Sequence, residues 1–147
     1  MSPSVNFLKA PDCRPVILRR VKNEADLQEY VRLRTGVSGM HKINLGTLSK
    51  TIFDNYAFIA RSAVEVTLGT ASFWPIEPLV ASVGIYIVPE MRGNGWGRAL
   101  LAEIEKEAKD AGFIAIRADI FEDNVDALKF FKGGGYKKFQ YFEKALV

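Results

Sequence analysis

Three glycines at alternate positions, Gly93, Gly95 and Gly97, form the part of this sequence best suited to chemistry, and Arg92 and Arg98 flank them. A glycine lets the main chain approach a ligand closely and adopts φ angles that other residues resist. A β-branched apolar run precedes the glycines, and a helical pattern follows them. Because a helix start presents unpaired N–H groups and the positive end of the helix dipole, the stretch predicts an anion site. A phosphate or pyrophosphate is its most natural ligand.

The elements that must position this turn follow from the hydropathy pattern. The apolar run Val83–Val88 predicts a buried strand, and Ala99–Ala111 predicts a helix that Gly112 ends. Apolar and polar residues alternate over Ile114–Ile120 and predict a second strand. A strand, a helix and a strand in this order imply a parallel crossover around the glycine turn.

Two common phosphate-binding patterns do not fit the turn. No Lys-Ser or Lys-Thr pair follows its last glycine, as a Walker loop requires, and Arg98 stands where the dinucleotide fingerprint GxGxxG needs a glycine. The pattern Arg92-x-x-Gly95-x-Gly97, preceded by a strand and Pro89, resembles instead the central coenzyme A motif of the GNAT superfamily of N-acetyltransferases. The alternative is a glycine-rich turn that closes a strand–helix unit and binds nothing.

A second stretch, residues 124–136, resembles another motif of the same superfamily, N-x-x-A-x-x-[LF]-Y-x-x-x-G-[FY]. The residues that fit it are Asn124, Ala127, Phe130, Gly135 and Tyr136. The two motifs occur in the right order with one expected strand between them, which strengthens the resemblance. It covers residues 83–136 closely and the N-terminal third only as a pattern of elements.

The element order and the resemblance predict an α+β fold in one acetyltransferase domain, 1–147, with a loose N-terminal arm at 1–14. The resemblance implies a GNAT-like α/β/α sandwich with a mixed, mostly antiparallel sheet of about six to seven strands and about four helices. Pro75–Pro78 is expected to break the pattern between two strands. The tail leaves room for one long strand or a tight hairpin, whose exposed edge a second subunit of a homodimer could cover. The further strands are expected at Val16–Val21, Tyr56–Ala60, Val64–Trp74 and within Tyr136–Val147, and the further helices from Asn23, at Leu45–Phe53 and at Asn124–Lys132.

The resemblance also implies cofactor roles. The N–H groups of residues 93–98 would hold the pyrophosphate of coenzyme A, and the backbone of Ile85 and Ile87 would pair with its pantetheine arm like an extra strand. Asn124 would contact the same arm. The co-substrate would be acetyl-CoA, and no metal is expected. The expected cofactor-binding residues are Ile85, Ile87, Val88, Arg92, Gly93, Asn94, Gly95, Trp96, Gly97, Arg98, Asn124 and Phe131.

The implied function is an acetyl-CoA-dependent N-acetyltransferase. The acetyl group would pass directly to a primary amine in a ternary complex, once a base has removed a proton from the amine. The acceptor would be a small molecule or a peptide amine. Two alternatives stay open: a coenzyme A-binding module with weak or no catalysis, and a phosphate-binding domain for another nucleotide.

Two departures from the family pattern leave the catalytic acid and base open. Phe131 stands where many members carry a tyrosine that protonates the departing thiolate, and Ala81–Val88 lacks the glutamate base that many members place there. Asp119 also has an ordinary interpretation, as an ion-pair partner of Arg117 or as an exposed acid. The predicted catalytic residues are Asp119 and Tyr141, with Glu77, Tyr86, Glu122 and ordered water as the other candidates.

Composition narrows the classes of function. The 147 residues carry a net charge of +3 without a Lys/Arg block, which gives a nucleic-acid partner little support. The single cysteine, Cys13, permits no intrachain disulfide and fits a reducing compartment. The first residues lack the features of a signal peptide, and no apolar run is long enough to span a membrane. We therefore expect a cytoplasmic protein without a membrane partner.

Overall fold

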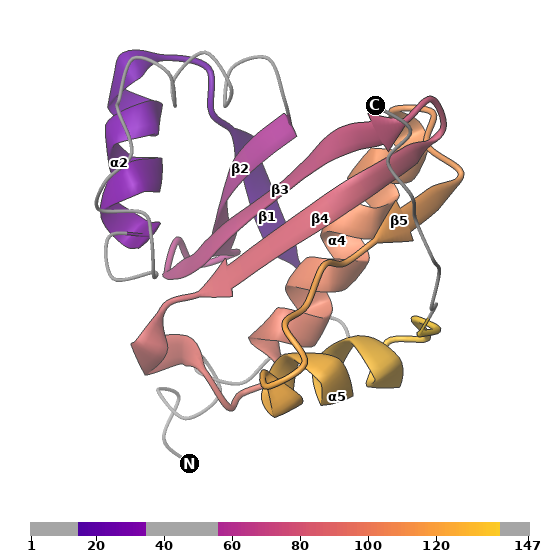
Figure 1. The fold of residues 1–147 in the computed structure, drawn as a ribbon. Helices are drawn as coiled ribbons and strands as arrows, with labels where there is room; N and C mark the ends of the chain where they lie inside the picture. Colours follow the sequence, from indigo (N-terminus) through magenta and orange to yellow (C-terminus); the bar gives the residue numbers. More distant parts are fainter. Residues whose placement is uncertain (1–14, 35–55, 139–147) are drawn as a thin grey trace.

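A five-stranded sheet with helices packed against it makes up residues 15–34 and 56–138, which the computed structural model describes (Figure 1). The strands lie side by side in chain order. They are β1 (Val16–Arg20), β2 (Tyr56–Ser62), β3 (Thr67–Glu77), β4 (Val80–Ile87) and β5 (Ala115–Arg117). The helices are α2 (Glu24–Arg34), α4 (Trp96–Asp110) and α5 (Val125–Gly133), with a 3-10 turn, η2 (Pro89–Met91), after β4.

The first four strands pair antiparallel, whereas β5 joins β4 in parallel. A parallel neighbour requires a crossover rather than a hairpin, and α4 supplies it. The predicted crossover around the glycine turn is therefore confirmed. The mixed, mostly antiparallel character of the sheet is confirmed as well.

Helices α2 and α4 pack on opposite faces of the sheet. Ala57 and Ile59 of β2 share a core cluster with Leu27 of α2. Phe58 and Ala60 belong to the larger cluster that α4 covers. This alternation follows from the two-residue period of a strand. We call the two sides of the sheet the α2 face and the α4 face.

Asparagine caps fix the starts of two helices. The side-chain oxygen of Asn23 accepts a hydrogen bond from the N–H of Asp26 at 2.9 Å, before α2. The side-chain oxygen of Asn124 accepts one from the N–H of Ala127 at 3.1 Å, before α5. Such caps satisfy N–H groups that lack a partner within the helix and contribute about 1 kcal/mol each. The predicted helices from Asn23 and Asn124 are confirmed.

Helix α4 begins at Trp96, earlier than its hydropathy pattern predicts, because Gly95 serves as its N-cap with a φ of 83°. At the other end the N–H of Phe113 donates to the carbonyl of Ala108 at 3.1 Å, and Gly112 has a φ of 100°. This arrangement is a Schellman motif, in which a left-handed glycine stops the helix. The prediction that Gly112 ends the helix is confirmed.

The predicted break at Pro75–Pro78 is wrong. Strand β3 continues through Pro75 to Glu77, and Pro75 lies opposite Ala81 of β4. Strand β2 pairs with β3 only as far as Phe73, so Pro75 has a strand neighbour on one side alone within the described residues. Proline lacks an N–H group and is tolerated where a strand has no neighbour on that side.

The predicted strand Ile114–Ile120 is too long. Strand β5 has only three residues, and they pair with Val80–Ser82 of β4. The residues after β5 keep the alternating pattern but leave the sheet. From Val83 onward, the edge of β4 that faces away from β3 therefore has no strand beside it in the described part of the chain. The candidate site lies along this open edge.

The expected six to seven strands and about four helices are not confirmed. The described residues contain five strands and three α-helices. The helix expected at Leu45–Phe53, the arm at 1–14 and most of the strand expected in the tail lie outside the described residues, while residues 136–138 form no strand. None of the described helices is long and apolar enough to cross a membrane.

Candidate active site

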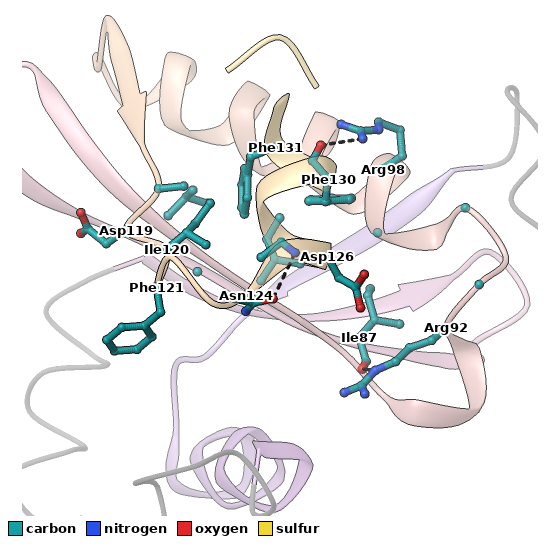
Figure 2. A pocket seen from close by; sticks show the side chains of 18 of the residues that line it. Ile87, Arg92, Arg98, Asp119, Ile120, Phe121, Asn124, Asp126, Phe130 and Phe131 are labelled. Atoms are coloured by element: carbon teal, nitrogen blue, oxygen red, sulfur yellow. Dashed lines mark hydrogen bonds between the residues drawn. The ribbon is translucent and has the colours of Figure 1, made fainter. Parts of the chain in front are cut away.

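A groove of about 790 Å³ runs along the open edge of β4, between this strand and α5 (Figure 2). Strand β4 pairs with β5 only as far as Ser82 and then continues to Ile87. Val83–Ile87 therefore forms one side of the groove, apart from Tyr86, and residues 118–121 with one face of α5 form the other. The separation of β4 from β5 creates the space.

The backbone of β4 directs hydrogen-bonding groups into this groove. The N–H of Val88 donates to the carbonyl of Leu68, on the β3 side, at 2.9 Å. Because the direction alternates along an antiparallel strand, Ile87 and Ile85 turn their N–H and C=O groups to the opposite edge. The carbonyl of Ile87 accepts a hydrogen bond there from Nε of Arg92 at 2.8 Å. The backbone groups of Ile85 are thus presented to a bound molecule.

The glycine turn closes one end of the groove. Gly93 and Gly95 have φ angles of 78° and 83°, which residues with a side chain resist. The first hydrogen bond along the α4 axis runs from the N–H of Ala99 to the carbonyl of Gly95. The N–H groups of the first helical turn therefore point out of the helix start, where Gly95 and Gly97 line the groove. This end of the groove suits an anion.

Both arginines beside the turn are engaged within the protein. Besides its bond to the Ile87 carbonyl, Arg92 places Cζ 5.3 Å from the centre of the Tyr86 ring. Arg98 donates to the carbonyl of Phe130 at 2.7 Å and places Cζ 4.5 Å from the centre of that ring. Figure 2 shows Arg98 turned toward α5. These contacts fix the two guanidinium groups but do not remove their charge, so the arginines and the backbone N–H groups both make this end of the groove positive.

Three of the expected cofactor-binding residues offer no side chain to the groove. Trp96 is 0% exposed and Val88 is buried, and Nδ2 of Asn94 donates to the carbonyl of Arg92 at 3.0 Å. Only the backbone of these residues is in a position to contact a ligand. The other expected residues line the groove: Ile85, Ile87, Arg92, Gly93, Gly95, Gly97, Arg98, Asn124 and Phe131.

One face of α5 forms the wall opposite β4. Asn124 uses its side-chain oxygen as the helix cap, so its amide NH₂ is the group available to a ligand. Asp126, Ala127 and Phe130 line the groove too, and the sequence analysis does not assign them to the site. Ala127 and Phe130 follow Asn124 in steps of three, so placing the expected helix on a helical wheel would have identified them. Asp126 is only two residues from Asn124, so the same wheel gives no signal for it. Figure 2 shows the Asp126 carboxylate projecting toward the side of the groove that holds the glycine turn.

Asp119 lies on the segment after β5 and lines the groove. Its carboxylate accepts a hydrogen bond from the hydroxyl of Ser82 at 3.3 Å. The alternative ion pair with Arg117 is not formed, because Arg117 pairs with Glu77 at 3.5 Å. Asp119 is exposed, so water reaches its carboxylate. Glu77 and Glu122 do not line the groove, which leaves Asp119 as the carboxylate among the expected catalytic residues that does.

Phe131, which stands where many family members carry a proton-donating tyrosine, packs among other aromatic rings. Phe131 contacts Phe130 and Tyr136 edge to face, with ring centres 5.1 Å apart in both pairs. The hydroxyl of Tyr136 donates to the carboxylate of Glu105 on α4 at 3.0 Å. Burial, the hydrogen bond to Glu105 and the charge of Glu105 raise the pKa of Tyr136 above that of a free tyrosine. Tyr136 therefore ties the chain to α4, and Tyr141 lies outside the described residues.

Residues 27–136 match the model of the acetyltransferase (GNAT) family. The match covers more than half of the chain and includes both motifs, the groove and α5. The chain belongs to the GNAT family of acetyltransferases. No curated protein matches the sequence at a significant level. Within residues 15–34 and 56–138, no three His, Cys, Asp or Glu side chains are grouped as metal ligands.

Solved structures share this GNAT fold. The aminoglycoside N-acetyltransferase AAC(6')-Iy in complex with CoA has a TM-score of 0.70 at 17% identity, over 94% of this chain and 99% of that chain. AAC(6')-Iy with the bisubstrate analog CoA-S-monomethyl-acetylneamine has a TM-score of 0.69 at 18% identity, over 88% and 98%. A transcriptional regulator from Bacillus halodurans C-125 has a TM-score of 0.66 at 23% identity, over 90% and 99%. At these identities the similarity shows the fold alone.

In this GNAT domain, Arg98 explains two of the glycines at the end of α5. A Cβ atom on Gly134 would lie 2.3 Å from Nη1 of Arg98, and one on Gly133 would lie 3.2 Å from Nη2. The φ of Gly134 is −86°, so its backbone does not require glycine. The missing side chain leaves room for a guanidinium that caps the last turn of α5 at the Phe130 carbonyl. Arg98 therefore fastens a wall of the groove to the start of α4.

The substitution Gly134→Ala is expected to displace Arg98 and loosen α5 from α4. Arg98→Met should lower the free energy of unfolding by about 1 kcal/mol. Gly134→Ala should lower it by less, because alanine at this compatible backbone also reduces the entropy of the unfolded chain. Combined with Arg98→Met, Gly134→Ala should cause no further loss, because the contact that it breaks is already gone. Urea unfolding of the four proteins measures this coupling. Gly133→Ala is the matched control, since its neighbour needs to move only a few tenths of an ångström. Fully additive losses would contradict the shared contact.

Proposed function

We propose that this protein is an N-acetyltransferase that transfers the acetyl group of acetyl-CoA directly to a primary amine, with both substrates bound at once. One observation carries the proposal: the open backbone edge of β4 meets a helix start that Gly93, Gly95 and Gly97 leave uncovered. One end of the groove suits a diphosphate and the other suits an amide-bearing chain. Coenzyme A contains both groups, joined in one molecule.

The fit to coenzyme A can be followed along the groove. The N–H groups of residues 93–98 are placed to bind the pyrophosphate, as a helix start binds phosphate groups elsewhere. The pantetheine amides would then lie beside β4, where Ile85 presents both N–H and C=O. The carbonyl of Ile87 is already bonded to Arg92, so Ile87 contributes its N–H. The amide NH₂ of Asn124, at the start of α5, would face the same arm.

The chemistry follows from where charge develops. The amine nitrogen bonds to the thioester carbon, the C–S bond breaks, and the sulfur leaves with its electron pair. Negative charge builds on the carbonyl oxygen during the attack, so an N–H of β4 aimed at that oxygen stabilises the transition state more than the ground state. The backbone at Ile85 is in the right place to supply this N–H. No covalent link to the protein forms.

Asp119 is the proposed base that takes the proton from the attacking amine. It borders the groove beside Ser82, at the point where β4 and β5 separate. Its exposure to water allows the proton to pass on to solvent. Neighbours named as aminoglycoside acetyltransferases support a small-molecule acceptor, whereas a transcriptional regulator with the same fold shows that fold alone does not select the acceptor.

A coenzyme A-binding module without catalysis is the second candidate. The observation in its favour is that Phe131 has no hydroxyl and is packed between Phe130 and Tyr136, so it gives no proton to a departing thiolate. Thiol release from acetyl-CoA in the presence of a panel of primary amines separates the two candidates. Binding of coenzyme A without amine-dependent thiol release would favour the module.

Gly95→Val is expected to abolish binding of coenzyme A. A β-branched residue resists the left-handed φ of Gly95, and its side chain would project where the diphosphate is proposed to bind. In the wild type, coenzyme A should raise the melting temperature, and ATP or NAD should raise it less. The matched control is Gly112→Val, which has the same kind of strain at the far end of α4 with open space around it. Unchanged affinity in Gly95→Val would refute the proposed site.

Asp126→Asn is expected to strengthen binding of coenzyme A, because it removes a carboxylate from a groove that receives a diphosphate. The gain should be about two- to fivefold at low ionic strength and should shrink as salt is added. Titration calorimetry at two salt concentrations measures it. Asp123→Asn removes an equal charge from a residue that does not line the groove and should leave affinity nearly unchanged. Equal gains in affinity for both variants would show that the net charge of the protein, and not the position of Asp126 in the groove, controls binding.

Asp119→Asn is expected to lower kcat by about a hundredfold or more, the usual contribution of a general base. The affinity for coenzyme A should stay the same, because the carboxylate faces the amine and not the diphosphate. Glu77→Gln, on the paired acid nearby, is the control and should keep wild-type kcat. A fully active Asp119→Asn variant would show that Asp119 is not the base and would favour ordered water in that role.

A further inference from the structure

The α2 face carries an aromatic side chain that the proposed reaction leaves unused. Trp74 of β3 is 36% exposed and stands directly opposite Ser82 of β4 in the strand register. Its indole atoms Cζ3 and Cη2 lie 3.6 and 3.7 Å from the position that a Cβ of Gly84 would take. Gly84 lines the groove, so the indole packs on the α2 face against a residue of the groove wall, where β4 has left β5.

Trp74 shares this face with Asp119. The hydroxyl of Ser82 donates to the Asp119 carboxylate at 3.3 Å, and Ser82 and Trp74 are cross-strand partners. The adjacent residues Phe73 and Val83 turn the other way, into the core that α4 covers. An indole and a carboxylate therefore flank Ser82 on the α2 face.

A second exposed aromatic ring lies on the segment that carries Asp119. Phe121 follows Asp119 by two residues, lines the groove and is 85% exposed. Figure 2 shows its ring projecting away from α5. Large apolar side chains gathered at a groove are costly to hydrate and mark places where a ligand covers them.

A positive charge also lies on the α2 face. Arg34 of α2 donates to the hydroxyl of Thr70 at 3.2 Å, which holds a guanidinium over β3 on this face. Glu77 is paired with Arg117 and so is partly neutralised. A single ammonium can pair with Asp119, whereas further ammonium groups would meet Arg34.

We propose that the acceptor is a monoamine whose nitrogen is joined by a short linker to an aromatic or bulky apolar group. This inference rests on the proposed acetyl transfer and names its acceptor class. Helices α4 and α5 cover the other side of the groove, so the acceptor reaches the thioester from the α2 face. Its ammonium meets Asp119, and its ring lies against Trp74 and Phe121.

The test compares kcat/KM for thiol release with 2-phenylethylamine, propylamine, spermidine and glucosamine. The wild type should prefer 2-phenylethylamine by about tenfold or more, in line with what one apolar contact contributes to discrimination. Trp74→Ala should lower kcat/KM for 2-phenylethylamine about tenfold and for propylamine by less than about twofold. Its affinity for coenzyme A should not change, and Trp74→Phe should recover most of the loss. Ile76→Ala, 38% exposed on the same strand, is the matched control and should behave as wild type.

A binding measurement that needs no turnover supports the kinetic one. The sequence has two tryptophans, and Trp96 is 0% exposed, so acrylamide quenches the fluorescence of Trp74 preferentially. With coenzyme A present, 2-phenylethylamine should shield Trp74 and reduce the quenching, while spermidine should not. Trp74→Phe should lack this response.

Each outcome bears on the inference. A preference for spermidine or glucosamine would overturn it, and so would a Trp74→Ala variant that loses activity equally with all amines. Acetylation of amines without apolar preference would overturn the acceptor class and leave the proposed function standing. Binding of coenzyme A with neither amine acetylation nor shielding of Trp74 would overturn both.

Discussion

The separation of β4 from β5 after Ser82 is the constraint on which the site depends. A strand that continues beyond its neighbour exposes N–H and C=O groups, and burying them without partners would be costly. Here α5 stands across the gap and does not fill it. The contacts of Phe131 with Phe130 and Tyr136, and the bond of Tyr136 to Glu105, fix α5 against α4. The opening is therefore held by packing on both sides, so its shape exists before a ligand arrives.

The distribution of charge around the groove follows from the same packing. Arg92 and Arg98 would be the obvious anion ligands, yet one completes the hydrogen bonding of the β4 edge and the other caps α5. A guanidinium has several N–H donors, so each arginine keeps its charge and most of its donors for a phosphate. The backbone N–H groups of the turn add to them. These groups are fixed by the turn and need little reorganisation on binding. Asp126 opposes them from the far wall, which limits how strongly the groove attracts anions in general.

Local signals predicted the parts of the fold that depend on local physics. The glycine turn, the caps at Asn23 and Asn124 and the stop at Gly112 each depend on a few neighbouring residues, and all are present. Pro75 was misinterpreted because its tolerance depends on where β2 ends, which is set by pairing and not by the sequence around Pro75. The length of β5 was misjudged for a related reason, since its alternating pattern continues after its partner strand has separated.

The sequence predicted where in the fold the candidate site lies, but not which partners its charged side chains contact. Arg98 and its partner Phe130 are 32 residues apart, so nothing near either residue signals that the guanidinium caps a helix. The spacing of Arg117 and Asp119 on one strand suggested an ion pair, but Arg117 pairs with Glu77 on β3. Asp126 was overlooked because an acid at a helix start has an ordinary role with the helix dipole. Arg98 and Arg117 each had several possible partners in the sequence, and tertiary contacts determine which of them is bound.

The absence of a hydroxyl at Phe131 shifts the demands of the proposed reaction. A thiolate is a good leaving group, so its departure depends less on proton donation than on stabilising the charge of the carbonyl oxygen. The more demanding proton transfer is then the one from the attacking amine, whose ammonium form is unreactive. An exposed carboxylate at Asp119 would serve that step, because a proton taken from the amine could leave to water at once. Catalysis in this chain would therefore rest on the fixed backbone of β4 and on one solvent-connected base, and not on a buried acid–base pair.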